Sequence, residues 1–501
     1  MADLLEGVGT STIRIPELWD MEADVVVVGF GGAGACAAIE AYDAGADVLI
    51  LEKMPVPGGT TKRCSGGIYC GGTSLQKELG IEDSPEEVYK FYMAVAHFGG
   101  ELSADPELAR VVADHGPQVF EWCRGLGISF PAHLWEVPGH FHKAKAGLSM
   151  TGNELFPEFA SVVSPKHRSH WCDGAGVAFF AALEAAVNKR GIKCMFGSPA
   201  RSLIADSRRV VCGLVAEGKT RSLYIRSKKA VILTAGGHGY NKELAKGLIR
   251  SSAAIESPNK IIPYSNTGDG IVMALALGAD YWAIDGGSAA PIGFMNPRDA
   301  FDTIWNQPRV FVNKDGKRYV NEDWHFSMQA VYLGRQPDLI GWAVIDDKVA
   351  STLGKDMIEE RIGAREIVRA ESVAALAKAI GVDRNGLEVT IAKWNDNVAK
   401  GKDTDWNREW GLKPLDTTGP LYATRVVLYE GNERTGVKIN TKAQVIDVAG
   451  RPIPGLYAAG RTSGGQYGLY PGCGISLMSC LVFGRIAGSN AAREMEHYAD
   501  K

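Results

Sequence analysis

Hydrophobic residues near the start of the chain follow a pattern that predicts a strand, a helix and a second strand in succession. Val25–Val28 is a short apolar run and Asp47–Leu51 is another, as expected of two buried strands. Between them, Cys36–Ala44 has the spacing of an amphipathic helix, which we expect to end at Gly45. A strand, a helix and a strand of these lengths form a βαβ unit, in which the two strands pair in parallel.

The turn before this helix carries the spacing Gly-x-Gly-x-x-Gly. Gly29 would permit the tight turn, Gly31 would let backbone N–H groups approach a pyrophosphate, and Gly34 would let helix and strand pack closely. Glu52, at the end of the second strand, is placed to accept hydrogen bonds from both ribose hydroxyls, and its charge disfavours the 2′-phosphate of NADP. The alternative for Glu52 is a solvated acid at a strand end. The framed motif predicts a bound dinucleotide, and therefore a redox cofactor.

A second set of apolar runs predicts a β-meander that returns to the same sheet. After a helix predicted over Ala175–Lys189, short β-rich runs with turns at 206–207 and 217–218 lead to an apolar strand that begins near Lys229. Ala235–Gly237 follows that strand directly and offers a second close approach of backbone to the cofactor. A meander at this place resembles FAD-binding proteins of the two-dinucleotide-fold type, whereas NAD dehydrogenases do not need one.

Charge and composition argue against several other classes. The 54 basic and 58 acidic residues give a formal net charge of −4 without a basic block, so we expect no nucleic-acid partner. The nine cysteines form no CxxC pair, which argues against a metal site, and their odd number argues against a full disulfide framework. The residues before 24 lack the basic start and apolar core of a signal peptide, and no apolar run approaches the roughly 20 residues of a bilayer span. We therefore expect a cytoplasmic protein without a transmembrane segment.

Further motifs follow along the chain. They are Gly58–Thr61 with Ser65–Gly67, Asn266–Gly270 before a predicted helix with Asp269 as its N-cap, Phe311–Glu322, Ile453–Arg461, and Phe483–Gly488. In this order and at these separations they resemble the FAD flavoproteins related to fumarate reductase and succinate dehydrogenase. Arg461 departs from the common pattern, which has Asp or Glu there. The resemblance implies that FAD is bound non-covalently, because residues 59–61 lack the histidine that covalently tethered relatives carry.

The resemblance also implies an α/β fold, with a Rossmann-like FAD-binding domain (parallel sheet plus β-meander) and an inserted α+β substrate domain. Cofactor-type signals cluster in residues 24–76, 195–280 and 430–490. We therefore expect a discontinuous FAD-binding domain at 1–285 and 429–501, and the substrate and catalytic domain at 286–428. The residues expected to bind FAD are Gly29, Gly31, Gly32, Ala33, Gly34, Glu52, Lys53, Gly59, Thr60, Thr61, Gly66, Gly67, Ala200, Arg201, Ala235, Gly236, Gly237, Asp269, Gly460, Arg461, Ser476 and Leu477.

Two segments near the C-terminus distinguish a dicarboxylate substrate from a ketone substrate. A fumarate-type site carries a His pair before its Gly-Val strand and an Arg in its C-terminal loop, because two carboxylates must be neutralised. Residues 430–437 of this chain lack the His pair, and residues 466–474 lack the Arg. The loop Tyr470-Pro-Gly-Cys-Gly474 instead resembles the YPGxG element of FAD-dependent 3-ketosteroid dehydrogenases.

That resemblance implies desaturation next to a carbonyl. The Tyr470 hydroxyl and the Gly474 N–H would hydrogen-bond the ketone oxygen while a base removes a proton from the adjacent carbon and a hydride passes to the flavin. The base tyrosine of the family is missing, and counting from Tyr319 leads to His325, with Tyr319 and Tyr467 as substitutes. The alternatives are a merely structural histidine at 325 and a turn tyrosine at 470.

The sequence therefore predicts an FAD-dependent desaturase of a cyclic ketone, with a 3-ketosteroid as the leading substrate class and a smaller alicyclic ketone as another. One alternative is an enoate or enone reductase of the fumarate-reductase type, which runs the same chemistry in reverse. A second alternative is an FAD electron carrier without its own substrate site. The electron acceptor stays open, and no second framed glycine motif supports direct use of NAD(P)H.

Overall fold

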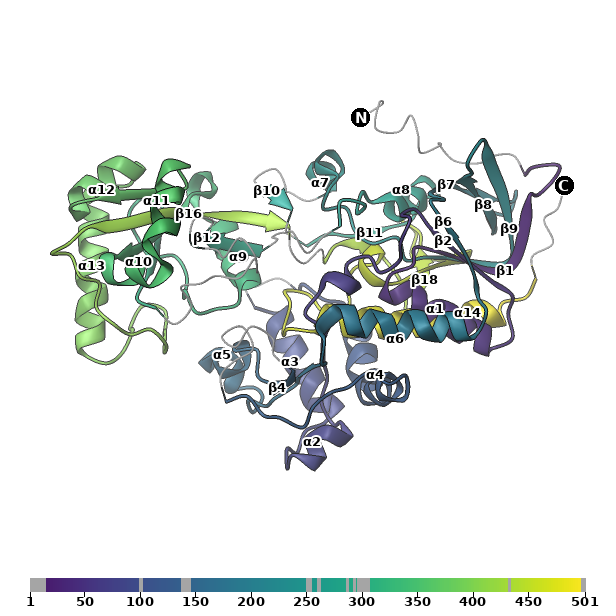
Figure 1. Ribbon diagram of the computed structural model, residues 1–501, viewed down its shortest axis with the longest axis horizontal. Helices are drawn as coiled ribbons and strands as arrows, with labels where there is room; N and C mark the ends of the chain where they lie inside the picture. The colour runs from purple at the N-terminus through teal and green to yellow at the C-terminus, as the bar shows by residue number, and fades with distance from the viewer. Residues whose placement is uncertain are drawn as a thin grey trace. The chain divides into compact units, whose positions relative to one another are not determined.

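The computed structural model describes residues 15–98, 102–136, 146–248, 255–258, 263–284, 288–291, 294, 307–430 and 434–496. The chain divides into two compact units. Unit 1 consists of Met1–Leu248, Ile261–Ile284 and Glu433–Lys501, and unit 2 of Ile249–Lys260 and Asp285–Asn432. The colours of Figure 1 run with residue number, and unit 1 contains both purple and yellow segments, from the two ends of the chain.

The main sheet of unit 1 is built around the predicted βαβ unit. Its path runs β18 (Gln444–Ile446), β19 (Pro452–Ala458), β9 (Ser222–Leu233), β1 (Met21–Val28), β2 (Val48–Glu52) and β6 (Lys193–Phe196). β1 pairs in parallel with both β2 and β9, with Val25 opposite Val48 and Ala230. The predicted meander is present: β7 (Ala200–Ala205), β8 (Val211–Glu217) and β9 pair antiparallel in sequence.

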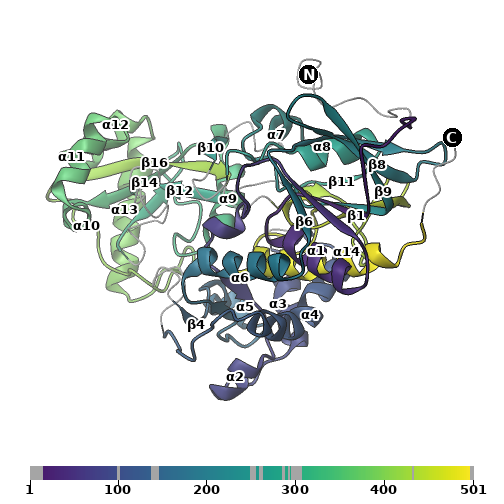
Figure 2. The same cartoon turned by 45° about the vertical axis from the view of Figure 1, so that its right-hand side comes forward.

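Helices α1 (Gly32–Asp43) and α14 (Ile475–Arg493) pack on each other and both contact β1 and β9. In Figures 1 and 2 they lie together with α6 (Ala175–Lys189), which contacts α1. Helix α1 begins four residues before the predicted start, because its first turn of glycine and alanine carries no amphipathic signal. Helix α14 is, within the described part of the chain, the one helix long and apolar enough to cross a membrane, but 67% of its apolar window is buried inside the protein, as in a core helix.

The rest of unit 1 surrounds this core with short elements. They are β3 (Gly67–Tyr69), α2 (Ser74–Glu78), α3 (Pro85–Ala96), α4 (Pro106–Gly125), β4 (Gly147–Ser149), α5 (Pro157–Ala160), β5 (Ser169–Trp171), α7 (Lys242–Leu248), α8 (Asp269–Ala276), β11 (Tyr281–Trp282) and β17 (Gly436–Val437). Strands β3, β5 and β4 pair antiparallel in that order and are called the small sheet below.

Unit 2 is an α+β unit around one long strand, β16 (Leu421–Glu430), which is drawn in pale green in Figure 1. Its other strands are β10 (Ile255–Pro258), β12 (Ser288–Pro291), β13 (Val310–Val312), β14 (Gly341–Asp346) and β15 (Ile367–Ala370). Its helices are α9 (Phe326–Gly334), α10 (Asp347–Leu353), α11 (Lys355–Gly363), α12 (Val373–Ile380) and α13 (Arg384–Ala399).

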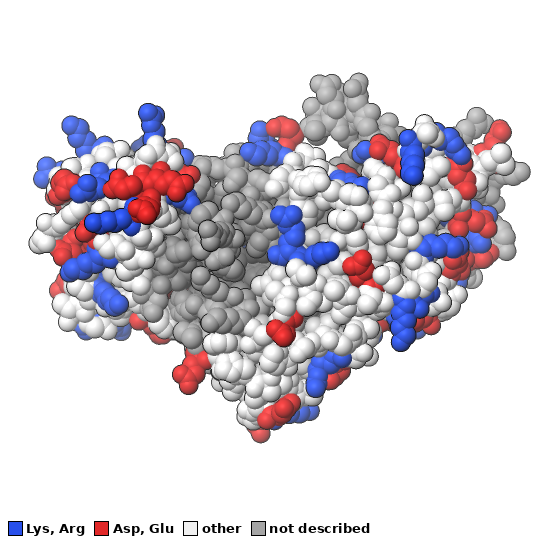
Figure 3. Space-filling view, in the orientation of Figure 1, with Lys and Arg blue, Asp and Glu red and all other residues white. Residues whose placement is uncertain are grey.

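The division into units differs from the predicted one at residues 249–260, which were placed in the cofactor domain and belong to unit 2. Strand β10 pairs in parallel with β16, and this pairing draws the segment into unit 2. The core of unit 2 gathers Trp394 and Leu387 of α13 with Leu376 of α12 against Val310 and Val344 of the sheet. On the face seen in Figure 3, acidic and basic side chains are interspersed over each unit.

Candidate functional site

The glycine turn between β1 and α1 is closely packed at two positions and open at a third. Gly29 has φ +103°, and a Cβ there would lie 2.6 Å from Thr234 O. A Cβ on Gly34 would lie 2.0 Å from Gly29 O, so helix and turn approach as predicted. A Cβ on Gly31 would have Gly58 O as its nearest neighbour among the described residues, 4.0 Å away. The turn therefore leaves space where a pyrophosphate would approach the backbone.

The N-terminus of α1 faces this space. Its N-cap residue is Gly31, so no side chain caps the helix there. The loop of residues 58–61 lies beside the turn, since Gly58 N donates to Phe30 O at 2.8 Å and Gly32 N donates to the Thr61 hydroxyl at 3.1 Å. From the far end of the chain, Gly460 approaches as well, because a Cβ there would lie 3.0 Å from the Ala33 Cβ. These backbones form a cradle at a helix N-terminus, which fits a dinucleotide phosphate.

Glu52 is fixed at the end of β2 beside this cradle. It is 9% exposed, Oε2 accepts from Phe30 N at 2.8 Å, and Oε1 accepts from Met54 N at 2.8 Å. The solvated alternative for Glu52 is therefore wrong. Each carboxylate oxygen keeps further acceptor capacity, which fits hydrogen bonds from ribose hydroxyls.

The expected N-cap role of Asp269 is wrong. The N-cap of α8 is Gly268, and it has no side-chain cap. The Asp269 carboxylate turns instead to Lys53 Nζ at 2.8 Å and accepts from the Thr267 hydroxyl at 2.6 Å. This ion pair joins two of the predicted cofactor residues, Lys53 and Asp269.

Predicted residues from the middle and the end of the chain also meet. Gly236, just after β9, has φ +83°, and its carbonyl accepts from the Thr462 hydroxyl at 3.0 Å. Ala235 lies 3.3 Å from a Cβ built on Gly270. Arg201 of β7 pairs with Glu217 at 2.6 Å on the meander. The remaining predicted cofactor residues also belong to unit 1; they are Gly59, Thr60, Gly66, Gly67, Ala200, Gly237, Ser476 and Leu477.

The tyrosines of the C-terminal loop are buried together in unit 1. Tyr467 is 5% and Tyr470 8% exposed, with ring centroids 6.0 Å apart at 81°. Burial raises the pKa of both phenols, against the opposing charge of Arg461. The Tyr470 hydroxyl is hydrogen-bonded to the Gly474 N–H, which lowers its pKa, and Tyr467 is hydrogen-bonded to Ser476. Tyr470 and Gly474 thus lie together, and a phenol that stays protonated can donate to a ketone oxygen. The same protonation argues against Tyr467 as a base near neutral pH.

The other two base candidates lie in unit 2. His325 is 1% exposed and caps α9, where its Nδ1 lies 2.8 Å from the Ser327 hydroxyl and accepts from Ser327 N. Tyr319 is 4% exposed, and its hydroxyl would lie 2.4 Å from a Cβ on Gly341. Burial raises the pKa of Tyr319 far above its ordinary range, so it is a poor base.

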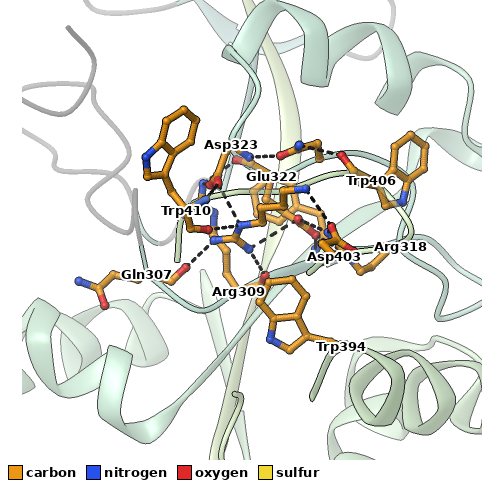
Figure 4. A network of polar contacts seen from close by, with 12 residues as sticks. Gln307, Arg309, Arg318, Glu322, Asp323, Trp394, Asp403, Trp406 and Trp410 are labelled. Atoms are coloured by element: carbon orange, nitrogen blue, oxygen red, sulfur yellow. Dashed lines mark hydrogen bonds and ion pairs between the residues drawn. The ribbon is translucent and has the colours of Figure 1, made fainter. Parts of the chain in front are cut away.

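A buried ionic network in unit 2 was not predicted (Figure 4). Arg318 pairs with Glu322 at 2.7 Å and with Asp403 at 2.9 Å, and all three side chains are at most 4% exposed. Arg408 pairs with Asp323 at 3.2 Å. Burial alone would raise the pKa of Glu322, but Arg318 and Arg408 hold it below its ordinary value. The network fixes the segment that leads to His325. The spacing of Arg318 and Glu322 was a visible signal, whereas nothing marked Asp403 or Arg408.

Some expectations fall outside the described residues. The segment where a fumarate-type site has its His pair includes residues 431–433, which lie there. Among the described residues, no group of three or more His, Cys, Asp or Glu could hold a metal ion.

Comparisons with known proteins agree with this geometry. The chain matches the family described as FAD binding domain over residues 24–477. It is 31% identical to a probable fumarate reductase of Shewanella frigidimarina (95% of this chain, 75% of the relative), and 30% identical to a urocanate reductase of Eggerthella lenta (96% and 76%).

Among solved structures, it is similar to 3-ketosteroid-Δ4-(5α)-dehydrogenase from Rhodococcus jostii RHA1 in complex with 4-androstene-3,17-dione. The TM-score is 0.81 and the identity 28%, with 97% of this chain and 100% of that chain covered. The predicted resemblance, the fold class and FAD as the cofactor are confirmed. The relatives divide between reductases and a steroid dehydrogenase, so the substrate is a separate question.

Proposed function

This chain belongs to the FAD-binding domain family and is an FAD-dependent oxidoreductase, and from that premise we propose that it desaturates a cyclic ketone next to its carbonyl. The leading substrate class is a 3-ketosteroid, and a smaller alicyclic ketone is the next. The solved structure with TM-score 0.81, a steroid dehydrogenase, supports this proposal.

The observation that carries the proposal is the pairing of Tyr470 with Gly474. Both groups are hydrogen-bond donors, both lie in one loop, and burial keeps the Tyr470 phenol protonated by raising its pKa. A protonated phenol with an N–H group beside it would stabilise, by donating to the ketone oxygen, the negative charge that develops when the adjacent carbon loses a proton. Bound FAD supplies the acceptor for the hydride. A carrier without a substrate site would have no need for such a donor pair.

A second candidate is an enoate or enone reductase, and Arg434 is the observation that favours it. Arg434 is 4% exposed, and its positive charge lowers the pKa of Tyr467. A buried guanidinium near these tyrosines would suit a substrate with a carboxylate. The reductases among the relatives support the same candidate.

Anaerobic flavin reduction separates the two candidates. Androst-4-ene-3,17-dione should bleach the flavin of the oxidised protein, with cyclohexanone as the small-ketone arm, whereas fumarate and urocanate should not reoxidise the reduced protein. Tyr470→Phe should slow bleaching about 100- to 1000-fold, as removal of one oxyanion donor does, and leave FAD content unchanged. Rapid turnover of fumarate or urocanate, at a rate that Tyr470→Phe does not change, would contradict the ketone proposal and favour the reductase.

For the base we propose His325 acting through Nε2, because Nδ1 caps α9. His325→Asn is the informative change, since asparagine is a good N-cap but has no basic nitrogen. We expect flavin reduction to fall about 100-fold or more, while the unfolding temperature stays close to that of the wild type. His325→Ala serves as the comparison, because it loses both functions. A normal rate in His325→Asn would show that His325 is a helix cap and not the base.

A further inference from the structure

The loop of residues 470–474, the proposed ketone clamp, rests on the small sheet. A Cβ on Gly472 would lie 2.2 Å from the Tyr69 ring, and a Cβ on Gly474 would lie 2.7 Å from the Ile68 carbonyl carbon. Both glycines are therefore required by the approach of the loop to β3. The loop and β3 touch without room for an intervening side chain.

Two side chains hold the loop by its carbonyl groups. The Ser169 hydroxyl of β5 donates to Cys473 O at 2.8 Å, and Asn153 Nδ2 donates to Pro471 O at 3.3 Å. Ser169 is 0% and Asn153 1% exposed. The two anchored carbonyls lie on either side of Gly472, between Tyr470 and Gly474, so they fix the part of the loop that joins the two proposed donors.

A buried carboxylate holds the residues on which the loop rests. Glu154, 1% exposed, accepts from the Tyr69 hydroxyl at 2.9 Å through Oε1. Its Oε2 accepts from Thr151 N and Gly152 N, both at 3.0 Å, and from the Thr151 hydroxyl at 2.6 Å. Glu154 thus fixes both the ring beneath Gly472 and the turn that carries Asn153.

Tyr470 needs such support, because its backbone is in the left-handed region at φ +72°. A non-glycine residue in that region is strained, and it persists where its surroundings determine the conformation. We propose that Ser169 and Asn153 are positioning residues for the ketone clamp: they hold the loop so that the Tyr470 hydroxyl and the Gly474 N–H stay side by side where a ketone oxygen would bind. This inference rests on the proposed function.

The test uses the FAD-bound protein and Ser169→Ala, with Ser149→Ala as the matched control. Ser149 of β4 stands opposite Ser169 in the β4–β5 register and is also 0% exposed, but its hydroxyl accepts from Trp171 Nε1 at 2.8 Å. The probe is p-nitrophenolate, whose charged oxygen resembles an enolate, titrated by its absorbance. Anaerobic flavin reduction by androst-4-ene-3,17-dione is measured in parallel.

We expect Ser169→Ala to slow flavin reduction and weaken p-nitrophenolate binding by about 10- to 100-fold, the loss typical of a displaced reacting group. The KM for the steroid should change far less than kcat, and FAD content and unfolding temperature should match those of Ser149→Ala. Ser169→Thr, which keeps the hydroxyl, should restore both readouts. Asn153→Ala, assayed in the same way, decides the question if Ser169→Ala does not fold.

Two outcomes overturn different claims. If Tyr470→Phe loses p-nitrophenolate binding while Ser169→Ala, or Asn153→Ala in its place, behaves like Ser149→Ala, the clamp exists and the positioning role is wrong. If Tyr470→Phe changes neither readout, the ketone clamp itself is wrong, and the positioning role falls with it.

Discussion

Two glycines in the turn between β1 and α1 differ in what a methyl group would meet. A Cβ on Gly34 would lie 2.0 Å from Gly29 O, whereas a Cβ on Gly31 would enter the space beside the cofactor cradle. Gly31 has φ −94°, which alanine adopts without strain. We therefore expect Gly34→Ala to lower the free energy of unfolding by about 1 to 3 kcal/mol or more, as overpacking does. Gly31→Ala should leave the unfolding temperature of the apoprotein unchanged and reduce the FAD content.

Thermal unfolding of the apoproteins, together with the flavin absorbance of the purified holoproteins, checks this pair. If Gly31→Ala retained FAD as tightly as the wild type does, the open space at this turn would not belong to the cofactor.

At the same scale, sequence reasoning succeeded where partners are close in the chain and failed where they are distant. The position of Glu52 at the end of its βαβ unit could be predicted, because its hydrogen bonds come from residues 22 positions or fewer away. His325 could only be counted from a family motif, and its use of Nδ1 as a cap depends on where α9 begins. Ser169 and Asn153 carry no sequence signal, because their loop partners are about 300 residues later in the chain.

At the scale of elements, the contact between α1 and α14 depends on glycine in the later helix. A Cβ on Gly488 would lie 2.1 Å from Ala37 O, inside the neighbouring helix. Gly488→Ala should force the helices apart and lower the free energy of unfolding by about 1 to 3 kcal/mol or more. Gly125→Ala is the control: Gly125 ends α4, has no atom within 4 Å of a built Cβ among the described residues, and should be stabilising by about 0.4 to 1 kcal/mol.

Chemical denaturation followed by circular dichroism measures both changes. Equal effects of the two substitutions would mean that the helix contact tolerates a methyl group.

Helices and strands with a long periodic pattern of apolar residues could be predicted, whereas short strands could not. The βαβ unit, the meander and α6 have long apolar patterns, and each was found near its predicted place. Strands of three residues, such as β3, β4 and β5, are too short for a period to show, so the small sheet was missed. Strand β10 was missed for a different reason, since its pairing with β16 spans about 170 residues of sequence.

At the scale of the whole molecule, the two units are separately compact. Every residue predicted to bind FAD belongs to unit 1, although these residues come from widely separated parts of the chain. Unit 2 has its own apolar cluster around Trp394 and its own buried ionic network. A ligand that binds the folded state stabilises the structure that holds it, by about 2.7 kcal/mol when its concentration is 100 times Kd.

Removal of FAD should therefore loosen unit 1 selectively. We also expect FAD to be bound non-covalently, so acid denaturation should release the flavin. In the refolded or flavin-stripped protein, amide hydrogen exchange should accelerate in peptides covering β1, α1 and the start of α14, by up to about 100-fold where opening requires FAD release. Peptides covering β14, β16 and α13 of unit 2 should exchange at the same rate with and without FAD, and they serve as the internal control. Addition of FAD should restore protection in unit 1. Equal acceleration in both units would contradict the assignment of the cofactor site to unit 1 alone, and flavin that stays with the precipitated protein would contradict non-covalent binding.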